Sequence, residues 1–391
     1  MLETSATQMT ESVRPGLGVK RYYRGLDGLR AVAILLVLFE HWVSYGPLKI
    51  VAPGGLGVNI FFVLSGFLIT EILLKRRGGP AGKVFREFWW RRAVRIFPVF
   101  YVFLALVWWL NIPGTRPLLP WSAAYAHNIY AALTGQIGPR VLSHIWSLCV
   151  EEQFYLLWPF LILLTPERWL ARVLFAAPVV GLAARAILIW TAPVPWASEI
   201  AYRSMPTAVD ALGMGAALAL VKIRFPALWA SFAARGPLIR LLVCIAIVVE
   251  AMLVRSPARL MDVVERSVSS ALAALVIILL ICCRENSRFA ALLESRILVY
   301  IGRISYGIYV YHLLIEYLLA PALTSWMKSH AYFGVGLLQY NIWMVQAPVF
   351  FAATLGAASL SFYGFERPLL KLKNLVGSAP IFLRPDAEQA A

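Results

Sequence analysis

The feature that most restricts the fold of this chain is a series of apolar blocks, each about long enough to cross a bilayer. Ten such blocks lie near residues 26–46, 55–74, 96–111, 144–164, 173–192, 200–221, 238–254, 268–283, 297–320 and 345–364. An α-helix needs about 20 residues to cross the hydrocarbon core, and it satisfies its backbone hydrogen bonds within the segment. The sequence therefore predicts an all-α integral membrane protein with about ten transmembrane helices.

The composition agrees with a membrane protein and argues against other classes. Hydrophobic residues make up 60% of the 391 residues and charged residues 14%, whereas soluble domains carry about 25% charged residues. The net charge of +16 does not indicate a nucleic-acid partner, because the basic residues lie between apolar segments and form no basic domain. The sequence has no Cys and His spacing typical of zinc, so we expect no metal.

The basic residues predict how the chain crosses the membrane. Of the 36 lysines and arginines, placing both termini in the cytoplasm leaves 25 on the cytoplasmic side, eight on the other and three within the spans, as the positive-inside rule favours. The first apolar run is too long for the core of a signal peptide, so we expect it to remain as the first membrane helix. We expect a multi-pass plasma-membrane protein with cytoplasmic tails at 1–24 and 371–391 around one membrane domain at 25–370.

Polar residues inside the expected first helix are candidates for function. Arg30 and His41 are eleven residues apart, which places both on one helix face and about 16 Å apart along the axis. Near the cytoplasm, Arg30 could hold a phosphate or carbonyl of a long donor, and deeper in the bilayer His41 could take a proton from a hydroxyl. The alternatives are an arginine reaching the interface and a histidine in an interhelical hydrogen bond.

A cluster of arginines precedes the third apolar block. Arg91, Arg92 and Arg95 would form one cationic edge if this segment is helical. Guanidinium groups bind phosphate oxygens in pairs, and coenzyme A carries a diphosphate and a 3′-phosphate, so three arginines would complement it. On spacing alone, a charge run that sets the topology and binds anionic lipid is an equally good interpretation.

Other polar positions admit two interpretations each. Glu151 and Glu152, at the expected start of the fourth helix, could orient His41 or hold an acceptor, or they could lie there because the helix dipole favours them. The 112–143 segment is expected as an outer loop whose aromatic residues either contact a glycan or form an interfacial belt. The roles of Glu40, Arg203, Asp210 and His312 stay open, with a structural hydrogen bond favoured for His312.

Five segments match one pattern when taken in order. They are Arg30 to His41 with ten residues between them, GVNIFFVLSGFLI at 57–69, RRAVR at 91–95, WSLCVEEQFY at 146–155 and ISYGIYVYH at 304–312, which is followed by Glu366-Arg367-Pro368. In this order the chain resembles the acyltransferase-3 family of membrane acyltransferases. Each match alone is weak, but the set spans nearly the whole chain and is specific.

The resemblance implies a fold, a reaction and roles for residues. It implies ten core helices, an acyl-CoA donor used as a substrate with no tightly bound cofactor, and a carbohydrate-containing acceptor such as a surface polysaccharide, a glycolipid or a glycoside. It also implies transfer of an acyl group, acetyl above all, by a protein of the bacterial inner membrane. By position, His41 matches the catalytic histidine, Glu366 the late carboxylate, and Arg30, Arg91, Arg92 and Arg95 the functional arginines.

Several points remain open at this stage. Asn59 stands where many family members have Asp, so we assign it no acid or base role. His41 could act as a general base or could accept the acyl group and relay it. The alternatives from other classes are a transporter of a lipid-linked glycan or small metabolite and a non-catalytic membrane subunit. Neither the acceptor, the acyl chain, the membrane face of transfer nor the oligomeric state follows from the sequence.

Overall fold

The structure is a computed structural model that describes residues 22–43, 54–253, 259–283, 288–329 and 335–376. These residues are almost entirely helical, with no strand among them. Nine helices in these ranges are long and apolar enough to cross a membrane. This confirms the predicted all-α membrane architecture. Cytoplasmic placement of both termini stays a prediction, and the expected tails lie mostly outside the described residues.

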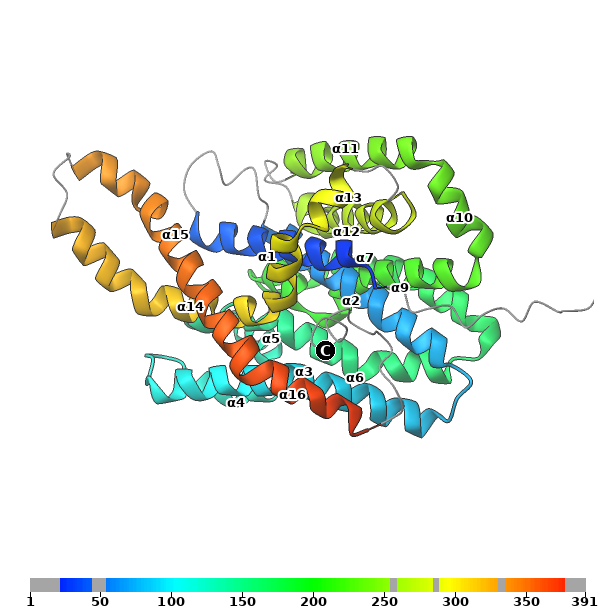
Figure 1. The fold of residues 1–391 in the computed structure, drawn as a ribbon, viewed down its shortest axis with the longest axis horizontal. Helices are drawn as coiled ribbons and strands as arrows, with labels where there is room; N and C mark the ends of the chain where they lie inside the picture. The colour runs from blue at the N-terminus through cyan, green and yellow to red at the C-terminus, as the bar shows by residue number, and fades with distance from the viewer. Residues whose placement is uncertain (1–21, 44–53, 254–258, 284–287, 330–334, 377–391) are drawn as a thin grey trace, which may run out of the picture.

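Ten long helices correspond one to one with the ten predicted blocks (Figure 1). They are α1 (Arg24–Trp42), α2 (Gly54–Arg76), α3 (Ala81–Trp109), α6 (Ile145–Leu164), α7 (Glu167–Thr191), α9 (Met205–Arg224), α11 (Gly236–Leu253), α12 (Arg259–Cys282), α14 (Arg296–Ser329) and α15 (Val335–Ser361). The nine apolar candidates exclude α1, which carries Asp27, Arg30 and Glu40 within 19 residues. The one long helix outside these nine candidates thus holds two predicted site residues, Arg30 and His41.

Two predicted boundaries differ from the structure for local reasons. The third helix begins at Ala81, so the arginine cluster lies inside it. The predicted sixth block is broken at Ser204, whose backbone is extended, and it forms α8 (Ala197–Arg203) and α9. Pro206 lies in the first turn of α9, where its missing N–H costs nothing.

The expected outer loop is largely helical. It folds into η2 (Arg116–Leu118), α4 (Leu119–Ala123), α5 (His127–Thr134) and η3 (Arg140–Leu142). Tyr125 is buried and stacks on Phe100 of α3, with the ring centroids 4.5 Å apart. Trp121 is more exposed and lies against Tyr130. Part of this aromatic set therefore anchors the segment on the membrane helices.

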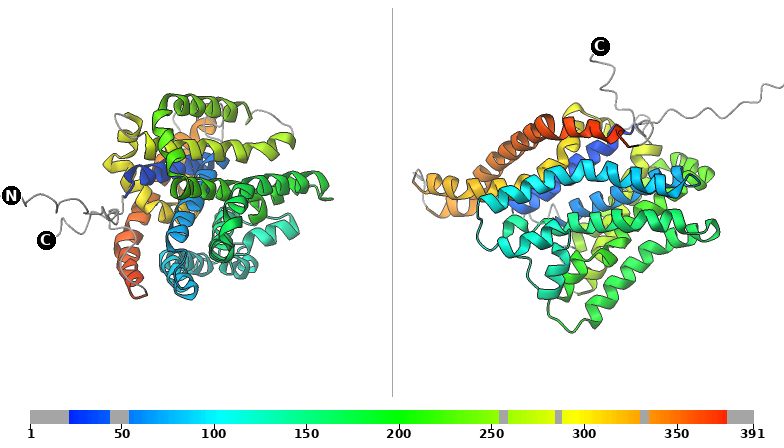
Figure 2. Two further views of the ribbon diagram at one scale, coloured as in Figure 1. Left: turned by 90° about the vertical axis from the view of Figure 1, so that its right-hand side faces the viewer. Right: turned by 90° about the horizontal axis from the view of Figure 1, so that it is seen from below.

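Small residues allow the central helices to approach one another closely (Figures 1 and 2). α1 packs between α2 and α14, α2 packs on α9, and α9 packs on α7. A Cβ at Gly302 of α14 would overlap the backbone oxygen of Asp27 on α1, and a Cβ at Gly66 of α2 would overlap that of Leu212 on α9. Backbone approach at small residues is typical of membrane helix packing.

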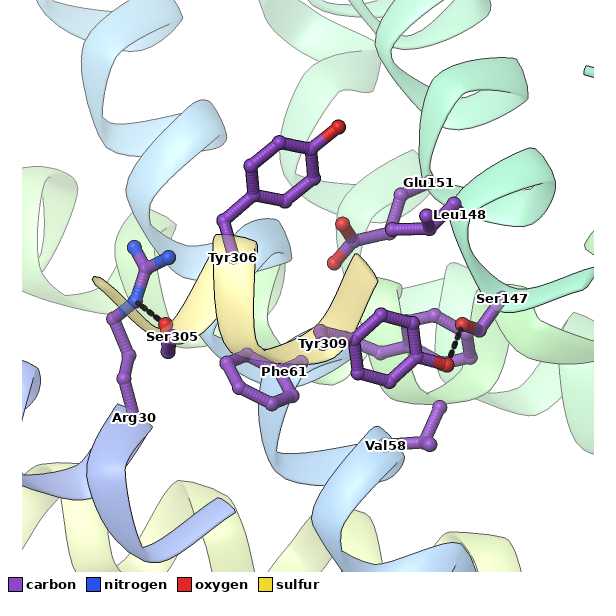
Figure 3. Close-up of a pocket in the computed structure, with 10 residues that line it drawn as sticks. Arg30, Val58, Phe61, Ser147, Leu148, Glu151, Ser305, Tyr306 and Tyr309 are labelled. Atoms are coloured by element: carbon purple, nitrogen blue, oxygen red, sulfur yellow. Dashed lines mark hydrogen bonds between the residues drawn. The ribbon is translucent and has the colours of Figure 1, made fainter. Parts of the chain in front are cut away.

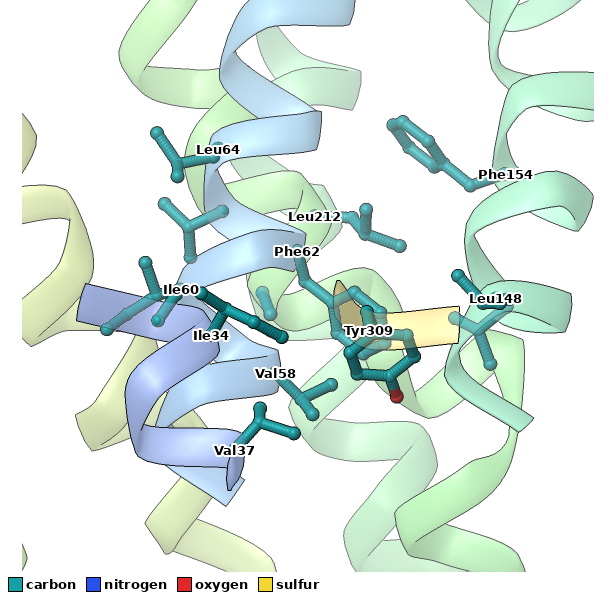
Figure 4. Close-up of a cluster of buried hydrophobic side chains, with 14 of the residues drawn as sticks. Ile34, Val37, Val58, Ile60, Phe62, Leu64, Leu148, Phe154, Leu212 and Tyr309 are labelled. Carbon is teal, nitrogen blue, oxygen red and sulfur yellow. The ribbon is translucent and has the colours of Figure 1, made fainter. Parts of the chain in front are cut away.

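The apolar core lies where α1, α2, α6, α9 and α14 meet (Figure 4). Ile34, Phe62 and Phe154 are almost completely buried there. The outer helices instead expose apolar side chains: Val179 of α7 is 65% exposed and Met252 of α11 is 64% exposed. Apolar side chains that face outward in this way suit contact with lipid and not with water.

One buried ion pair ties the outer helices to this core. Arg185 of α7 lies 2.7 Å from the Asp210 carboxylate of α9, and Ser267 of α12 hydrogen-bonds to both. Arg203 ends α8 and pairs with Glu199. Both residues thus pair with other charges, one deep in the protein and one near its surface.

Candidate active site

Arg30 and His41 lie at opposite ends of one face of α1. Arg30 is in the second turn, where its Nε donates a long hydrogen bond of 3.4 Å to Ser305 Oγ on α14 (Figure 3). His41 is in the last turn, about 16 Å further along the axis. α1 and α14 pack closely over this stretch, so both residues face α14.

A pocket opens beside Arg30 between four helices (Figure 3). It encloses about 400 Å³ of empty volume, part of it open to solvent. Its lining comes from α1, α2, α6 and α14: Arg30; Val58, Phe61 and Phe62; Ser147, Leu148 and Glu151; and Ser305, Tyr306 and Tyr309. Mostly apolar walls with a few polar groups are typical of small-molecule sites.

Glu151 lies across the pocket from Arg30 (Figure 3). Its Oε1 accepts a 2.8 Å hydrogen bond from Ser65 Oγ of α2, and Ser65 is also 2.9 Å from the hydroxyl of Tyr155. A hydroxyl from a neighbouring helix therefore fixes the carboxylate. The pocket has a guanidinium group on one wall and a hydrogen-bonded carboxyl group on the other.

The sequence suggested that Glu151 and Glu152 begin their helix, but in the structure they do not. α6 begins at Ile145, which places both residues about two turns inside it, beyond the reach of the terminal dipole. Glu152 is about 100° further round the helix and is not among the residues that line the pocket. Of the two carboxylates, Glu151 is the one in contact with the candidate site.

The arginine cluster of α3 approaches the same region from a third direction. The Arg92 guanidinium lies 5.2 Å from the centre of the Tyr155 ring, so it adjoins the Ser65–Glu151 network. Among the described residues, Nε and Nη2 of Arg91 are buried and have no hydrogen-bond partner. Buried guanidinium donors without a partner are unusual and indicate a place for an anion.

Glu366 lies near Arg95, at the end of the site where the arginines of α3 lie. It closes η4 (Phe362–Glu366), a short π-helical turn after α15, and accepts a 3.0 Å hydrogen bond from Ser361 Oγ. It lies against Gly307 of α14 and interacts electrostatically with Arg95. Gly307 precedes His312 by about 7 Å along the axis of α14, so Glu366 is placed with Arg95 and not at the level of the histidine.

His41 is held by its own helix and by the outer segment. Its Nδ1 lies 2.8 Å from the backbone oxygen of Val37. A carbonyl oxygen only accepts, so Nδ1 carries a proton and neutral His41 presents a lone pair at Nε2. Arg140 of η3 donates a 2.6 Å hydrogen bond to the backbone oxygen of His41 and pairs with Glu316 of α14 at 2.8 Å.

His312 lies next to His41, and His144 lies next to His312. The centroid of the His312 ring is 4.9 Å from that of His41 and 4.9 Å from that of His144. His312 makes the expected hydrogen bond, from Nδ1 to the backbone oxygen of Tyr309 at 2.6 Å. The Tyr309 hydroxyl lies 2.9 Å from the backbone oxygen of His144 and 2.5 Å from Ser147 Oγ. Tyr309 thus separates the pocket from the three rings.

The sequence did not single out several residues that line or shape this site. They are Ser65, Ser147, Tyr155, Ser305, Tyr306, Tyr309 and, just before its helix, His144. All except His144 fall inside the segments 57–69, 146–155 and 304–312 on which the family resemblance depends. Those segments were the available signal, but only the folded chain shows which of their residues point inward.

The arrangement offers acid–base and nucleophilic chemistry at a site lined by arginines. Within the described ranges, no group of three or more His, Cys, Asp or Glu side chains is placed to hold a metal ion. Together, the helices and the pocket define a multi-pass helical membrane protein with a polar site buried among its central helices.

Comparison with known proteins gives the family. The family described as "Acyltransferase domain" matches residues 23–363, and the chain belongs to it. The peptidoglycan O-acetyltransferase OatA of Listeria monocytogenes is 30% identical over 380 residues, covering 90% of this chain and 56% of its own length. A provisionally named peptidoglycan O-acetyltransferase of Bacillus subtilis is 37% identical over 158 residues, 36% of this chain and 23% of its own length.

The chain matches only part of the length of each of these relatives. This chain spans about half the length of the Listeria relative and about a quarter of the Bacillus one. No solved structure matches the chain.

Proposed function

We propose that this protein is a membrane O-acyltransferase that moves an acyl group, expected to be acetyl, from acyl-CoA to a hydroxyl of a carbohydrate-containing acceptor. The observation that carries the proposal is the pocket between α1, α2, α6 and α14, which has Arg30 and Glu151 on its walls and the histidine cluster behind Tyr309. Family membership supports the reaction class.

The arginines support an acyl-CoA donor. Arg92 adjoins the Ser65–Glu151 network, and the unpartnered Nε and Nη2 of Arg91, the preceding residue of α3, would bind phosphate oxygens of coenzyme A. Arg30, which makes a long hydrogen bond to Ser305, would bind the pantetheine arm. The thioester end would then point past Tyr309 toward His41.

His41 has the protonation that acyl transfer requires. With Nδ1–H donated to the backbone oxygen of Val37, Nε2 is the basic and nucleophilic atom. In one route it takes the proton of the acceptor hydroxyl while the oxygen attacks the thioester, and it then gives that proton to the leaving thiolate. In the other route it attacks the thioester and carries the acyl group to the acceptor.

The names of the relatives suggest which acceptor to test first. Two of them are named as peptidoglycan O-acetyltransferases, one provisionally, so a peptidoglycan hydroxyl is our leading candidate within the carbohydrate class. The outer segment that carries Trp121 and Arg140 would meet such a glycan if the transfer takes place on that face.

The proposal is tested by supplying isolated membranes with radiolabelled acetyl-CoA and measuring label in the glycan fraction. We expect transfer with the wild type and a loss of at least about a hundredfold with His41→Ala, as for other general bases and nucleophiles. His127→Asn, at a buried histidine of α5 outside the pocket, is the matched control and should stay active. Equal labelling by wild type and His41→Ala would contradict the assigned chemistry.

A further inference from the structure

The three histidine rings form a buried chain that a single-base reaction does not need. His41, His312 and His144 come from α1, α14 and the residue before α6, and neighbouring centroids are 4.9 Å apart. His312 and His144 are 0% and 2% exposed. Burial of three imidazoles in contact is costly unless each has a role or a partner.

The hydrogen bonds fix which nitrogen of His312 carries the proton. Its Nδ1 lies 2.6 Å from the backbone oxygen of Tyr309, which can only accept, so Nδ1 is protonated. The lone pair of neutral His312 is therefore on Nε2. Among the described residues this atom is buried and has no hydrogen-bond partner. In His41, too, Nδ1 lies on a backbone oxygen, that of Val37.

We infer that His312 is the general base that removes the proton of the acceptor hydroxyl while His41 carries the acyl group. This inference rests on the proposed function and selects the two-step route within it. Once Nε2 of His41 is acylated, it cannot also act as the base for the second step. The neighbouring ring then supplies the lone pair that the attacking hydroxyl needs.

The atoms and electrons of the two steps balance. First, Nε2 of His41 bonds to the thioester carbon, the carbon–sulfur bond breaks, and coenzyme A leaves as a thiolate that takes a proton from water. Then the acceptor oxygen bonds to the acyl carbon, the carbon–nitrogen bond breaks, and the electron pair returns to His41. The hydroxyl proton goes to Nε2 of His312 and from there to water.

The surroundings of His312 suit a base that is neutral before the reaction. His41 and His144 face it as further imidazoles, and Arg140 adds a positive charge that is partly offset by Glu316. Like charges close together repel, so a cation beside His312 favours its neutral form before the reaction. Tyr309 contributes its backbone oxygen and a hydroxyl that is engaged elsewhere.

The test separates the two half-reactions. Exchange of labelled coenzyme A with acetyl-CoA in the absence of acceptor measures acylation of His41, and label in the glycan fraction measures the whole reaction. For His312→Asn, which keeps a donor for the Tyr309 oxygen but has no atom at Nε2, we expect exchange to persist within about threefold while transfer falls at least about a hundredfold. His312→Gln is the second variant and should show the same split.

Every outcome bears on the inference. Transfer at the wild-type level in His312→Asn or His312→Gln would overturn it. An equal fall of exchange and of transfer in both variants would also overturn it, because it would show that His312 has a structural role. A wild type that transfers acetyl without exchanging coenzyme A would leave the proposed function standing and refute the two-step route. A wild type with neither activity would refute the proposed function itself, and the inference with it. His127→Asn again serves as the matched histidine control.

Discussion

Arg140 shows how one exposed side chain can set the position of a buried reactive group. Its guanidinium bridges the backbone oxygen of His41 and the carboxylate of Glu316, so it joins the end of α1 to α14 across the outer segment. Side-chain exposure of 55% for Arg140 means that the ion pair itself contributes little to stability, about 0–1 kcal/mol. Its value lies in geometry, because misplacement of a catalytic group by about 1 Å can cost a hundredfold in rate.

We therefore predict that Arg140→Ala lowers the rate of acetyl transfer about tenfold or more with little change in the donor concentration needed for half-maximal rate. Thermal unfolding in detergent should stay close to that of the wild type. Arg116→Ala is the control, since Arg116 lies over the Trp108 ring in the same outer segment. A large fall in unfolding temperature for Arg140→Ala would mean that the residue is structural.

The sequence identified some site residues and could not identify others, for a physical reason. Arg30 and Glu151 are ionisable residues inside membrane helices. Burying such groups in a membrane costs free energy, so they are candidates for function, and both line the pocket. Tyr309 and Ser147 are ordinary residues in membrane helices, and their importance comes from one contact across 162 positions of sequence. Arg91, Arg92 and Arg95 were predicted as one edge, but only the fold shows that Arg92 faces Tyr155 and Arg95 faces Glu366.

At the scale of helices, the close approach of α1 and α14 holds the two walls of the site together. Gly302 meets the backbone of Asp27 in the turn before Arg30, and Ser305 contacts Arg30 one turn later. Helix lengths and positions followed from the apolar blocks, because the bilayer sets them. Which helices become neighbours did not, because small residues at contact points are a weak signal until the partner is known.

We predict that Gly302→Ala destabilises the protein by about 1–3 kcal/mol, because the added Cβ overlaps the backbone oxygen of Asp27 and forces the helices apart. The measurement is thermal unfolding of the detergent-solubilised protein. Gly356→Ala of α15 is the matched control, since a Cβ there meets no atom within 4 Å. Equal unfolding temperatures for the two variants would show that α1 and α14 are not closely packed in the membrane.

At the scale of the molecule, the distribution of lysines and arginines predicts the orientation in the bilayer. If both termini are cytoplasmic, the turn between α2 and α3 faces inward and the segment between α5 and η3 faces outward. In a background without the four native cysteines, Gln136→Cys should react with a membrane-impermeant maleimide in intact cells, whereas Gly79→Cys should react only after permeabilisation. The opposite pattern would reverse the orientation.

The hydrogen bond between Arg30 and Ser305 joins residues that are 275 positions apart. A ribosome makes the chain from its N-terminus, so α1 enters the bilayer long before α14 exists to cover it. During that interval the Arg30 guanidinium, and later the Glu151 carboxyl group, lie among lipids or other helices without their final neighbours. The free-energy cost of this placement grows with their desolvation. Helix α14 is therefore what completes the walls of the pocket, and a nascent chain cannot close the pocket before α14 has been made.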